Sequence, residues 1–295
     1  METNEIKQSR FTEERALFGA RDLTVTDTIF DVGESPLKEC TNIEIRNSVF
    51  RWRYPIWYCS QVVADGCTFW QAARASVWYS NDVTVRNTSV SAPKSFRRCR
   101  NLSLENVFFS DADETLWHCS GVKLSNVTFK GNYFAMNSEE ITVDGLLLDG
   151  KYSFDGVKNA VIRNSRLVTK DAFWNSENVT VSDSFISGEY IGWNAKNLTF
   201  INCTIESLQG LCYVQNLRLV NCKLLNTTLA FEYSEVEADI ASGVESVFNP
   251  KSGTIRAERI GELVIEPDKV DPKKTRIVCS DIAKTSNRPD WSEIF

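Results

Sequence analysis

Apolar and polar residues alternate along this chain in a pattern that returns about every 19 residues. The stretch KNLTFINCTI, residues 196–205, is preceded one period earlier by ENVTVSDSFI and followed one period later by QNLRLVNCKL. In each copy two apolar residues flank one polar residue and precede an Asn or Asp, as Leu198 and Phe200 precede Asn202. Alternation over so few residues predicts a short β-strand with one buried face.

The polar residue after the second apolar position forms a column of turn residues. Its members are 19–21 residues apart and are all Asn, Asp or Gly: Asp27, Asn47, Gly66, Asn87, Asn106, Asn126, Gly145, Asn164, Asp183, Asn202 and Asn221. These residue types tolerate a left-handed backbone better than the others do. The column therefore predicts a stack of identical sharp turns.

Two further apolar columns share this period. One lies three residues after the turn and includes Phe30, Phe50, Phe69, Phe109 and Phe129. The other lies six residues before the first apolar position of the strand and includes Leu17, Leu37, Ile56, Val77 and Leu116. Three short strands in each period make one coil of a β-solenoid, in which successive coils pair in parallel about 4.8 Å apart. We predict an all-β, single-stranded parallel β-helix of about 12 coils of 19–21 residues.

The same columns predict how the chain is divided. The register runs through residues 16–262, which we assign to the solenoid. Residues 1–15 are expected to form an N-terminal cap, and residues 263–295 a C-terminal tail or cap that packs on the solenoid.

The period and its asparagine column resemble the right-handed parallel β-helix of the pectin-lyase-like superfamily. Within it, the sequence is most similar to a bacterial family defined only as a domain of unknown function. Left-handed β-helices repeat every 18 residues and pentapeptide-repeat proteins every fifth, so neither fits. The resemblance implies a fold and no chemistry.

Tryptophan is concentrated at one position of the repeat, directly after the apolar column that contains Leu37, Ile56 and Val77. That position holds Trp57, Trp78, Arg97, Trp117, Trp174 and Trp193, and the next position holds Tyr58, Tyr79, Arg98 and His118. A charged residue such as Arg97 is costly in a dry core, so this column is expected to face outward. A large exposed aromatic surface is usually a binding site for a ligand or for another protein. The alternatives are cover by the C-terminal tail or a second subunit, and an inward stack if a bend shifts the alternation.

The sequence does not decide whether the protein is an enzyme. Polysaccharide lyases and glycoside hydrolases of the resembling superfamily work on this outer face with clustered Asp residues, sometimes with Ca²⁺, and an Arg or Lys base. The weak candidates here are His118, Arg98, Asp155 and Asp171, and none lies in a motif of those enzymes. No cofactor or metal is expected.

The composition argues against some classes of binding partner. The net charge is −6 and the pI near 5.1, which argues against nucleic acid or an anionic membrane as the main partner. No apolar run is long enough to span a membrane, and the nine cysteines fall mostly in small-residue columns, where reduced thiols pack. We therefore expect a cytoplasmic protein.

These observations support three functional hypotheses. The first is a carbohydrate-like ligand on the aromatic column. The second is a structural or oligomerisation module in which the aromatic face is a subunit interface. The third is a polysaccharide lyase or glycoside hydrolase.

Overall fold

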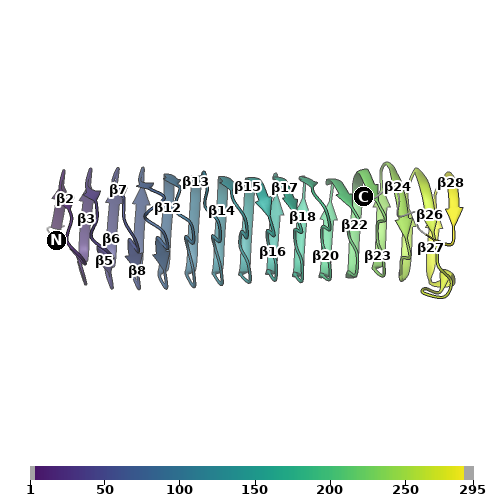
Figure 1. The fold of residues 1–295 in the computed structure, drawn as a ribbon, viewed down its shortest axis with the longest axis horizontal. Helices are drawn as coiled ribbons and strands as arrows, with labels where there is room; N and C mark the ends of the chain where they lie inside the picture. The colour runs from purple at the N-terminus through teal and green to yellow at the C-terminus, as the bar shows by residue number, and fades with distance from the viewer. Residues whose placement is uncertain (1–3, 289–295) are drawn as a thin grey trace. The chain divides into compact units, whose positions relative to one another are not determined.

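The chain forms two compact units, Met1–Lys151 and Tyr152–Phe295, and the computed structural model describes residues 4–288. Each unit is a parallel β-solenoid in which every turn stacks on the one before it (Figure 1). The predicted fold is confirmed. The solenoid has about 15 turns rather than about 12.

The first unit contains eight turns, and each turn starts with a strand of 4–13 residues. These strands are β1 (Asn4–Lys7), β3 (Arg21–Thr26), β6 (Thr41–Arg46), β9 (Ser60–Asp65), β12 (Asn81–Val90), β13 (Arg100–Phe109), β14 (Ser120–Lys130) and β15 (Glu139–Lys151). A short second leg follows in β2 (Arg10–Phe11), β4 (Ile29–Phe30), β7 (Val49–Phe50) and β10 (Thr68–Phe69), and a third in β5 (Leu37–Lys38), β8 (Ile56–Trp57) and β11 (Val77–Trp78).

The second unit contains seven turns. Their first legs are β16 (Lys158–Arg163), β18 (Glu177–Ser182), β20 (Lys196–Ile201), β22 (Gln215–Thr228), β23 (Glu235–Ile240), β25 (Ser252–Arg256) and β27 (Thr275–Val278). The remaining strands are β17 (Arg166–Lys170), β19 (Phe185–Ser187), β21 (Thr204–Leu208), β24 (Gly243–Phe248), β26 (Arg259–Val264) and β28 (Asp281–Ser286), and Pro272–Lys274 form a 3₁₀ turn.

The additional turns lie at the two ends of the chain. Strand β1 pairs in parallel with β3, and β27 and β28 pair in parallel with β25 and β26. The parallel register therefore extends beyond the expected limits of 16–262 on both sides. The outer turns lack the complete apolar and Asn columns, which is why their membership is hard to recognise in the sequence.

Among residues 4–288 the third leg is a separate strand only in the turns of β5, β8 and β11, and its position lies within β24 where Val247 bridges Ala230. This corrects the expectation of three strands in every coil. In later turns its inward residue has a left-handed backbone, as at Phe96 (φ 56°), Leu116 (φ 61°) and Phe173 (φ 62°). A strand cannot continue through that conformation, so this leg is reduced to turns and isolated bridges.

The core consists of inward columns that run from turn to turn. Phe30, Phe50 and Phe69 stack with ring centroids 4.7 Å apart, and all are at most 2% exposed. Burying one such side chain stabilises the fold by about 1.5–3 kcal/mol. Because each ring needs the rings of adjacent turns to cover it, the turns stabilise one another.

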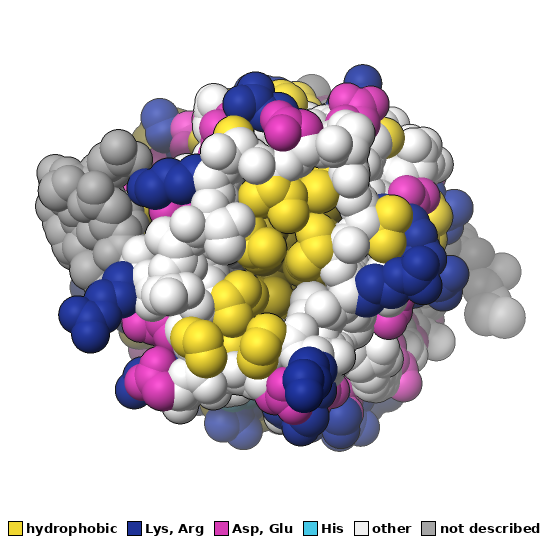
Figure 2. All heavy atoms as spheres, turned by 90° about the vertical axis from the view of Figure 1, so that its right-hand side faces the viewer, with side chains coloured by type: hydrophobic (Ala, Val, Ile, Leu, Met, Phe, Trp, Pro, Cys, Tyr) yellow, Lys and Arg dark blue, Asp and Glu magenta, His cyan; other side chains and the backbone are white. Residues whose placement is uncertain are grey.

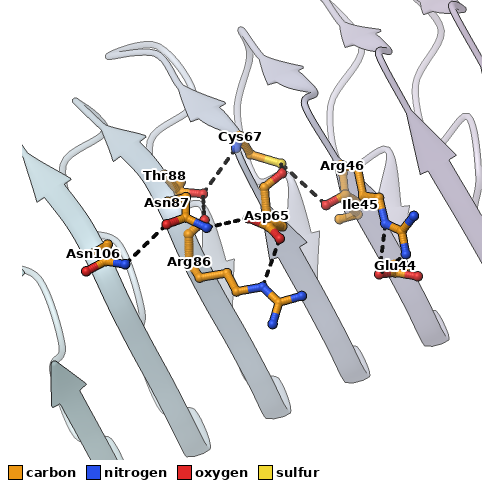
Figure 3. Close-up of polar contacts among 9 residues, drawn as sticks. All are labelled: Glu44, Ile45, Arg46, Asp65, Cys67, Arg86, Asn87, Thr88 and Asn106. Carbon is orange, nitrogen blue, oxygen red and sulfur yellow. Dashed lines mark hydrogen bonds and ion pairs between the residues drawn. The ribbon is translucent and has the colours of Figure 1, made fainter.

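Side-chain ladders join successive turns at the corners (Figure 3). Nδ2 of Asn106 donates to Oδ1 of Asn87 at 3.2 Å, and Nδ2 of Asn87 donates to Oδ1 of Asp65 at 2.9 Å. Asn87 and Asn106 have left-handed backbones, with φ of 50° and 52°. The hydrogen bond from Asn87 lowers the pKa of the Asp65 carboxyl, and the ion pair with Arg86 lowers it further.

All nine cysteines are free thiols, and eight of them are buried. Sγ of Cys67 donates to the carbonyl of Ile45 at 3.6 Å, one turn away (Figure 3). Burial raises the pKa of Cys67 and that of Cys203 to about 11. These thiols therefore act as small core residues.

Candidate ligand-binding sites

The predicted tryptophan column exists in the first unit. Lys38, Trp57, Trp78, Arg97 and Trp117 occupy successive positions of one parallel ladder. Their inward neighbours Ile56 and Val77 are fully buried, whereas the indoles are half-buried. The column therefore faces outward here, and the alternative of an inward stack is wrong for these residues.

The indole faces in this column are already covered by neighbours. The rings of Trp57 and Trp78 are parallel within 4° and 5.2 Å apart. Cζ of Arg97 lies 5.1 Å from the Trp78 ring centroid and 4.2 Å from that of Trp117, so its guanidinium fills the space between them. Arg97 also forms an ion pair with Glu114. A sugar ring cannot stack on a face that another side chain covers.

The polar edges of these indoles are also bonded. Nε1 of Trp57 donates to the carbonyl of Ala75 at 2.8 Å, and Nε1 of Trp78 donates to that of Lys94 at 2.6 Å. In the adjacent column Tyr58 and Tyr79 stack at 4.9 Å. Stacked aromatic pairs contribute about 0.5–1.5 kcal/mol each. In this unit the ladder is a part of the scaffold.

A polar groove of about 610 Å³ lies beside that ladder in the first unit. Its lining includes Tyr79, Arg98, Arg100, His118 and Glu139. The lining thus contains two guanidiniums and one carboxylate. Within residues 4–288, neither Arg98 nor Arg100 has an ion pair, unlike Arg97. The groove is suited to an anionic group.

The backbone at this groove is strained. Tyr79, Arg98 and His118 have φ between 50° and 54°, where Asn175 and Asn194 stand in equivalent turns of the second unit. A left-handed residue other than Gly, Asn or Asp costs roughly 1–2 kcal/mol. The same conformation recurs at this corner in other turns, as at Tyr58 (φ 56°) and Tyr213 (φ 59°), so it belongs to the winding of the solenoid. Arg98 and His118 are binding candidates because they line the groove.

An aromatic pocket of about 590 Å³ lies in the second unit. Its lining is Tyr152, Lys170, Asp171, Trp174, Tyr190, Trp193 and Gln209. Here the two indoles are 6.1 Å apart and tilted by 34°, unlike the parallel rings of the first unit. Tyr190 meets Trp193 edge to face at 5.8 Å. Trp193 also contacts Tyr213, with ring centroids 4.7 Å apart and planes tilted by 39°. The aromatic rings of this unit therefore line a cavity as tilted pairs and not as a parallel stack.

Polar groups border the same pocket. Nζ of Lys170 forms an ion pair with Glu189 at 2.7 Å and lies 5.3 Å from the Tyr190 ring centroid. Asp171 is only 3% exposed, and Nε2 of Gln209 donates to the carboxylate of Glu232 at 3.0 Å. The pocket thus combines aromatic walls with hydrogen-bonding groups.

Of the predicted site residues, Trp174, Trp193 and Asp171 line this pocket. Tyr152, Tyr190 and Gln209 were not predicted. Together with Asp171 they form a column of 19-residue spacing, three residues before the tryptophan column, with φ between 46° and 57°. That spacing could have revealed them.

The outward column does not continue beyond Trp193, although the 19-residue repeat does. Cys212 and Phe231 are 0% exposed, and Glu232 is 8% exposed. The following turn is shorter, with Ala230 bridged to Val247 and Glu232 to Pro250. Residues 246–250 therefore cover these positions, so the outward column ends at Trp193.

The remaining catalytic candidates are not gathered into one constellation. Asp155 lies in the second unit and accepts a hydrogen bond from Nδ2 of Asn175 at 3.1 Å. Arg98 and His118 lie in the first unit and line its groove. Across the described residues, no group of three or more His, Cys, Asp or Glu side chains is arranged to hold a metal ion, and no helix has the length and apolar character to cross a membrane.

A protein-family model matches residues 4–278 of the chain, which is nearly all of the described solenoid. The chain belongs to the family described as "Protein of unknown function (DUF3737)". This DUF3737 protein matches no curated protein.

Solved structures match the chain at low identity and low TM-score. The A-module of mannuronan C-5 epimerase AlgE4 from Azotobacter vinelandii is 12% identical, with 97% of this chain and 87% of that chain covered and a TM-score of 0.27. HetL, a pentapeptide repeat protein of the cyanobacterium Nostoc sp., is 10% identical, with coverage of 80% and 89% and a TM-score of 0.29. PfbA, a surface adhesin of Streptococcus pneumoniae, is 9% identical, with coverage of 96% and 75% and a TM-score of 0.28. At these values the likenesses carry no argument on function.

Proposed function

We propose that this DUF3737 protein binds a carbohydrate-like ligand in the aromatic pocket of the second unit. The proposal rests on one observation: Trp174 and Trp193 splay apart beside a cavity of about 590 Å³. A sugar ring has an apolar face that suits an aromatic wall, and hydroxyls that suit Asp171, Gln209 and Lys170. Binding pockets typically combine aromatic walls with a few oriented polar groups in this way.

Binding is favoured over glycoside hydrolysis for a chemical reason. Hydrolysis normally uses two carboxyls about 5–9.5 Å apart. Asp171 is the one carboxylate among the described residues that line the pocket. The lyase or hydrolase hypothesis therefore has less support than recognition alone.

A second candidate is the groove of the first unit, which would take an anionic ligand such as an acidic sugar. It is supported by the two unpaired guanidiniums of Arg98 and Arg100, with His118 beside them. Salt screens exposed charges, so binding there should weaken as ionic strength rises.

One set of titrations tests both sites. The probes are neutral and uronate-containing oligosaccharides, selected on a glycan array and then measured by calorimetry. If the pocket binds, Trp193→Ala should lose about 1–3 kcal/mol of binding free energy through the lost aromatic contact. Trp57→Ala, in the closed ladder, is the matched control and should bind normally.

Arg98→Ala separates the two sites. A loss of affinity in this variant alone, with a strong dependence on salt, would assign the ligand to the groove. If the wild-type protein binds no oligosaccharide, or if all three variants bind like the wild type, the proposal is wrong.

We also infer a cytoplasmic location, which is supported by the free state of all nine thiols. Fractionation of source cells with compartment markers tests it, and recovery in an exported fraction would contradict it. A subunit interface built on the aromatic face has less support, because neighbouring side chains already cover the ladder of the first unit.

A further inference from the structure

The last described turn exposes side chains that equivalent turns bury. Ile277 in β27 continues the inward column of Ile255, and Ile282 in β28 continues that of Ile260. Ile255 and Ile260 are 0% exposed, whereas Ile282 is 37% exposed and Ile277 is half-buried. Figure 2 shows hydrophobic side chains at the centre of this end, with charged side chains around them.

The first turn of the chain is open in the same way. Ile6 in β1 pairs with Val25, and Phe11 in β2 pairs with Phe30. Both partners are at most 2% exposed, yet Ile6 and Phe11 are only half-buried. The Phe11 ring stacks on Phe30 at 5.5 Å, and the described residues provide no ring for its other side.

The two ends have the same construction. At the C-terminal end a four-residue strand, Thr275–Val278, is followed by two residues and then by β28, which starts at Asp281. At the N-terminal end a four-residue strand, Asn4–Lys7, is followed by two residues and then by β2, which starts at Arg10. One alignment therefore sets Ile277 against Ile6 and Ile282 against Phe11.

The outward charges in this alignment are complementary. Arg276 is set against Glu5, and Asp281 against Arg10. Within the chain Asp281 already pairs with Arg259 at 3.4 Å, and Arg10 with Asp31 at 2.5 Å. A second copy in register would extend these pairs into a ladder of alternating sign. Opposite charges on adjacent strands are stabilising, and like charges are destabilising.

We propose that the last turn of one copy docks on the first turn of a second copy, β27 on β1 and β28 on β2, so that the β-solenoid continues across the two chains. Such an interface would repeat the parallel pairing of turns within each chain. It would cover the apolar centre of Figure 2 and provide partners for the free edges of both strands. Because the two surfaces differ, the contact is head to tail and leads to a ring or to a longer filament.

Charge reversal tests this arrangement in the full-length protein. The expected result is oligomers whose size grows with concentration, measured by sedimentation velocity. Glu5→Arg or Arg276→Glu should each weaken the association by roughly tenfold or more, because like charges then oppose each other across the contact. The double variant with both changes should recover it.

Mixing and a control make the test specific. An equimolar mixture of the two single variants should also associate, because each then offers the other a complementary end. Lys123→Glu, on an exposed position opposite Ser103 and Thr142, should associate like the wild type. A protein that stays monomeric at every concentration overturns the proposal. Loss in Arg276→Glu with no effect of Glu5→Arg would indicate tail-to-tail pairing instead and would also overturn it.

Discussion

Glu232 is a largely buried carboxylate in the second unit. It is 8% exposed and accepts a hydrogen bond from Gln209. Burial raises the pKa of the Glu232 carboxyl above its ordinary value of 4.5, although the hydrogen bonds from Gln209 and Tyr213 oppose the shift. Burial also raises the pKa of Tyr213 to about 12, and the charge of Glu232 adds to that effect.

This residue makes stability depend on pH. A raised pKa means that the folded protein binds the proton more tightly than the unfolded chain does. The contribution is therefore complete below pH 4.5 and is lost as pH rises through the folded pKa. Glu232→Gln stays neutral and keeps an acceptor for Gln209.

We expect the free energy of unfolding of Glu232→Gln to become larger relative to that of the wild type as the pH rises from about 4 to about 8, because only the wild type loses stability over this range. Urea unfolding followed by circular dichroism measures it, with the exposed Glu237→Gln variant as the control. A difference that stays constant over this range would show that the burial of Glu232 does not affect its titration.

At the level of the elements, hydrogen-bonded ladders of Asn side chains join successive turns. In the second unit Nδ2 of Asn178 donates to Asn159 at 3.0 Å, Nδ2 of Asn197 to Asn178 at 2.7 Å, and Nδ2 of Asn216 to Asn197 at 2.9 Å. All four residues have φ between 53° and 58°. Asn is therefore selected twice, for its backbone and for its side chain.

Two substitutions of Asn197 separate these roles. Asn197→Ala breaks two hydrogen bonds and leaves a Cβ in a left-handed conformation, so it should destabilise the protein by about 2–4 kcal/mol. Asn197→Gly loses the same hydrogen bonds without the steric cost and should destabilise by about 1–2 kcal/mol less. Chemical denaturation measures both. Equal losses in the two variants would mean that backbone strain is unimportant at this corner.

The inward columns could be predicted from the sequence because their cause is local. Leu198 and Phe200 alternate with polar residues, and Asn202 favours the left-handed turn that follows. The backbone conformation of the third leg could not be predicted from the sequence, because Phe96 and Phe173 are apolar like strand residues while their backbones are left-handed. Apolarity shows that a side chain is buried but does not specify φ.

The same limit applies to the candidate sites. Spacing placed Trp57 and Trp78 in one outward column, but it could not show that their faces cover each other. Whether two indoles stack or splay depends on side-chain angles and on neighbours such as Arg97 and Tyr190. Only the three-dimensional arrangement distinguishes the closed ladder of the first unit from the pocket of the second.

At the scale of the whole molecule, stability is spread over contacts between adjacent turns. Asn197 and Asn216 are 19 residues apart and equivalent, as are Leu198 and Leu217. Because each turn contacts mainly its neighbours, such a fold behaves as a one-dimensional array. Removing one whole turn should therefore leave every column continuous.

We expect the deletion of residues 197–215 to give a folded, β-rich protein that unfolds cooperatively at a somewhat lower denaturant concentration. Deletion of residues 197–206 is the control, because it removes about half a turn and sets inward residues against outward ones. Circular dichroism and denaturant titration compare the two. If both deletion variants fold, or if neither does, the alignment of equivalent residues in successive turns is not what specifies this fold.

The tilted contact of Trp174 and Trp193 also has an optical consequence. Two indole chromophores 6.1 Å apart share their ultraviolet excitations, and because their planes are tilted by 34° the coupled transitions give a split signal of paired opposite sign in circular dichroism. Replacing either indole by Phe would remove that signal. The second unit therefore contains an intrinsic reporter of its own winding, which requires no added dye.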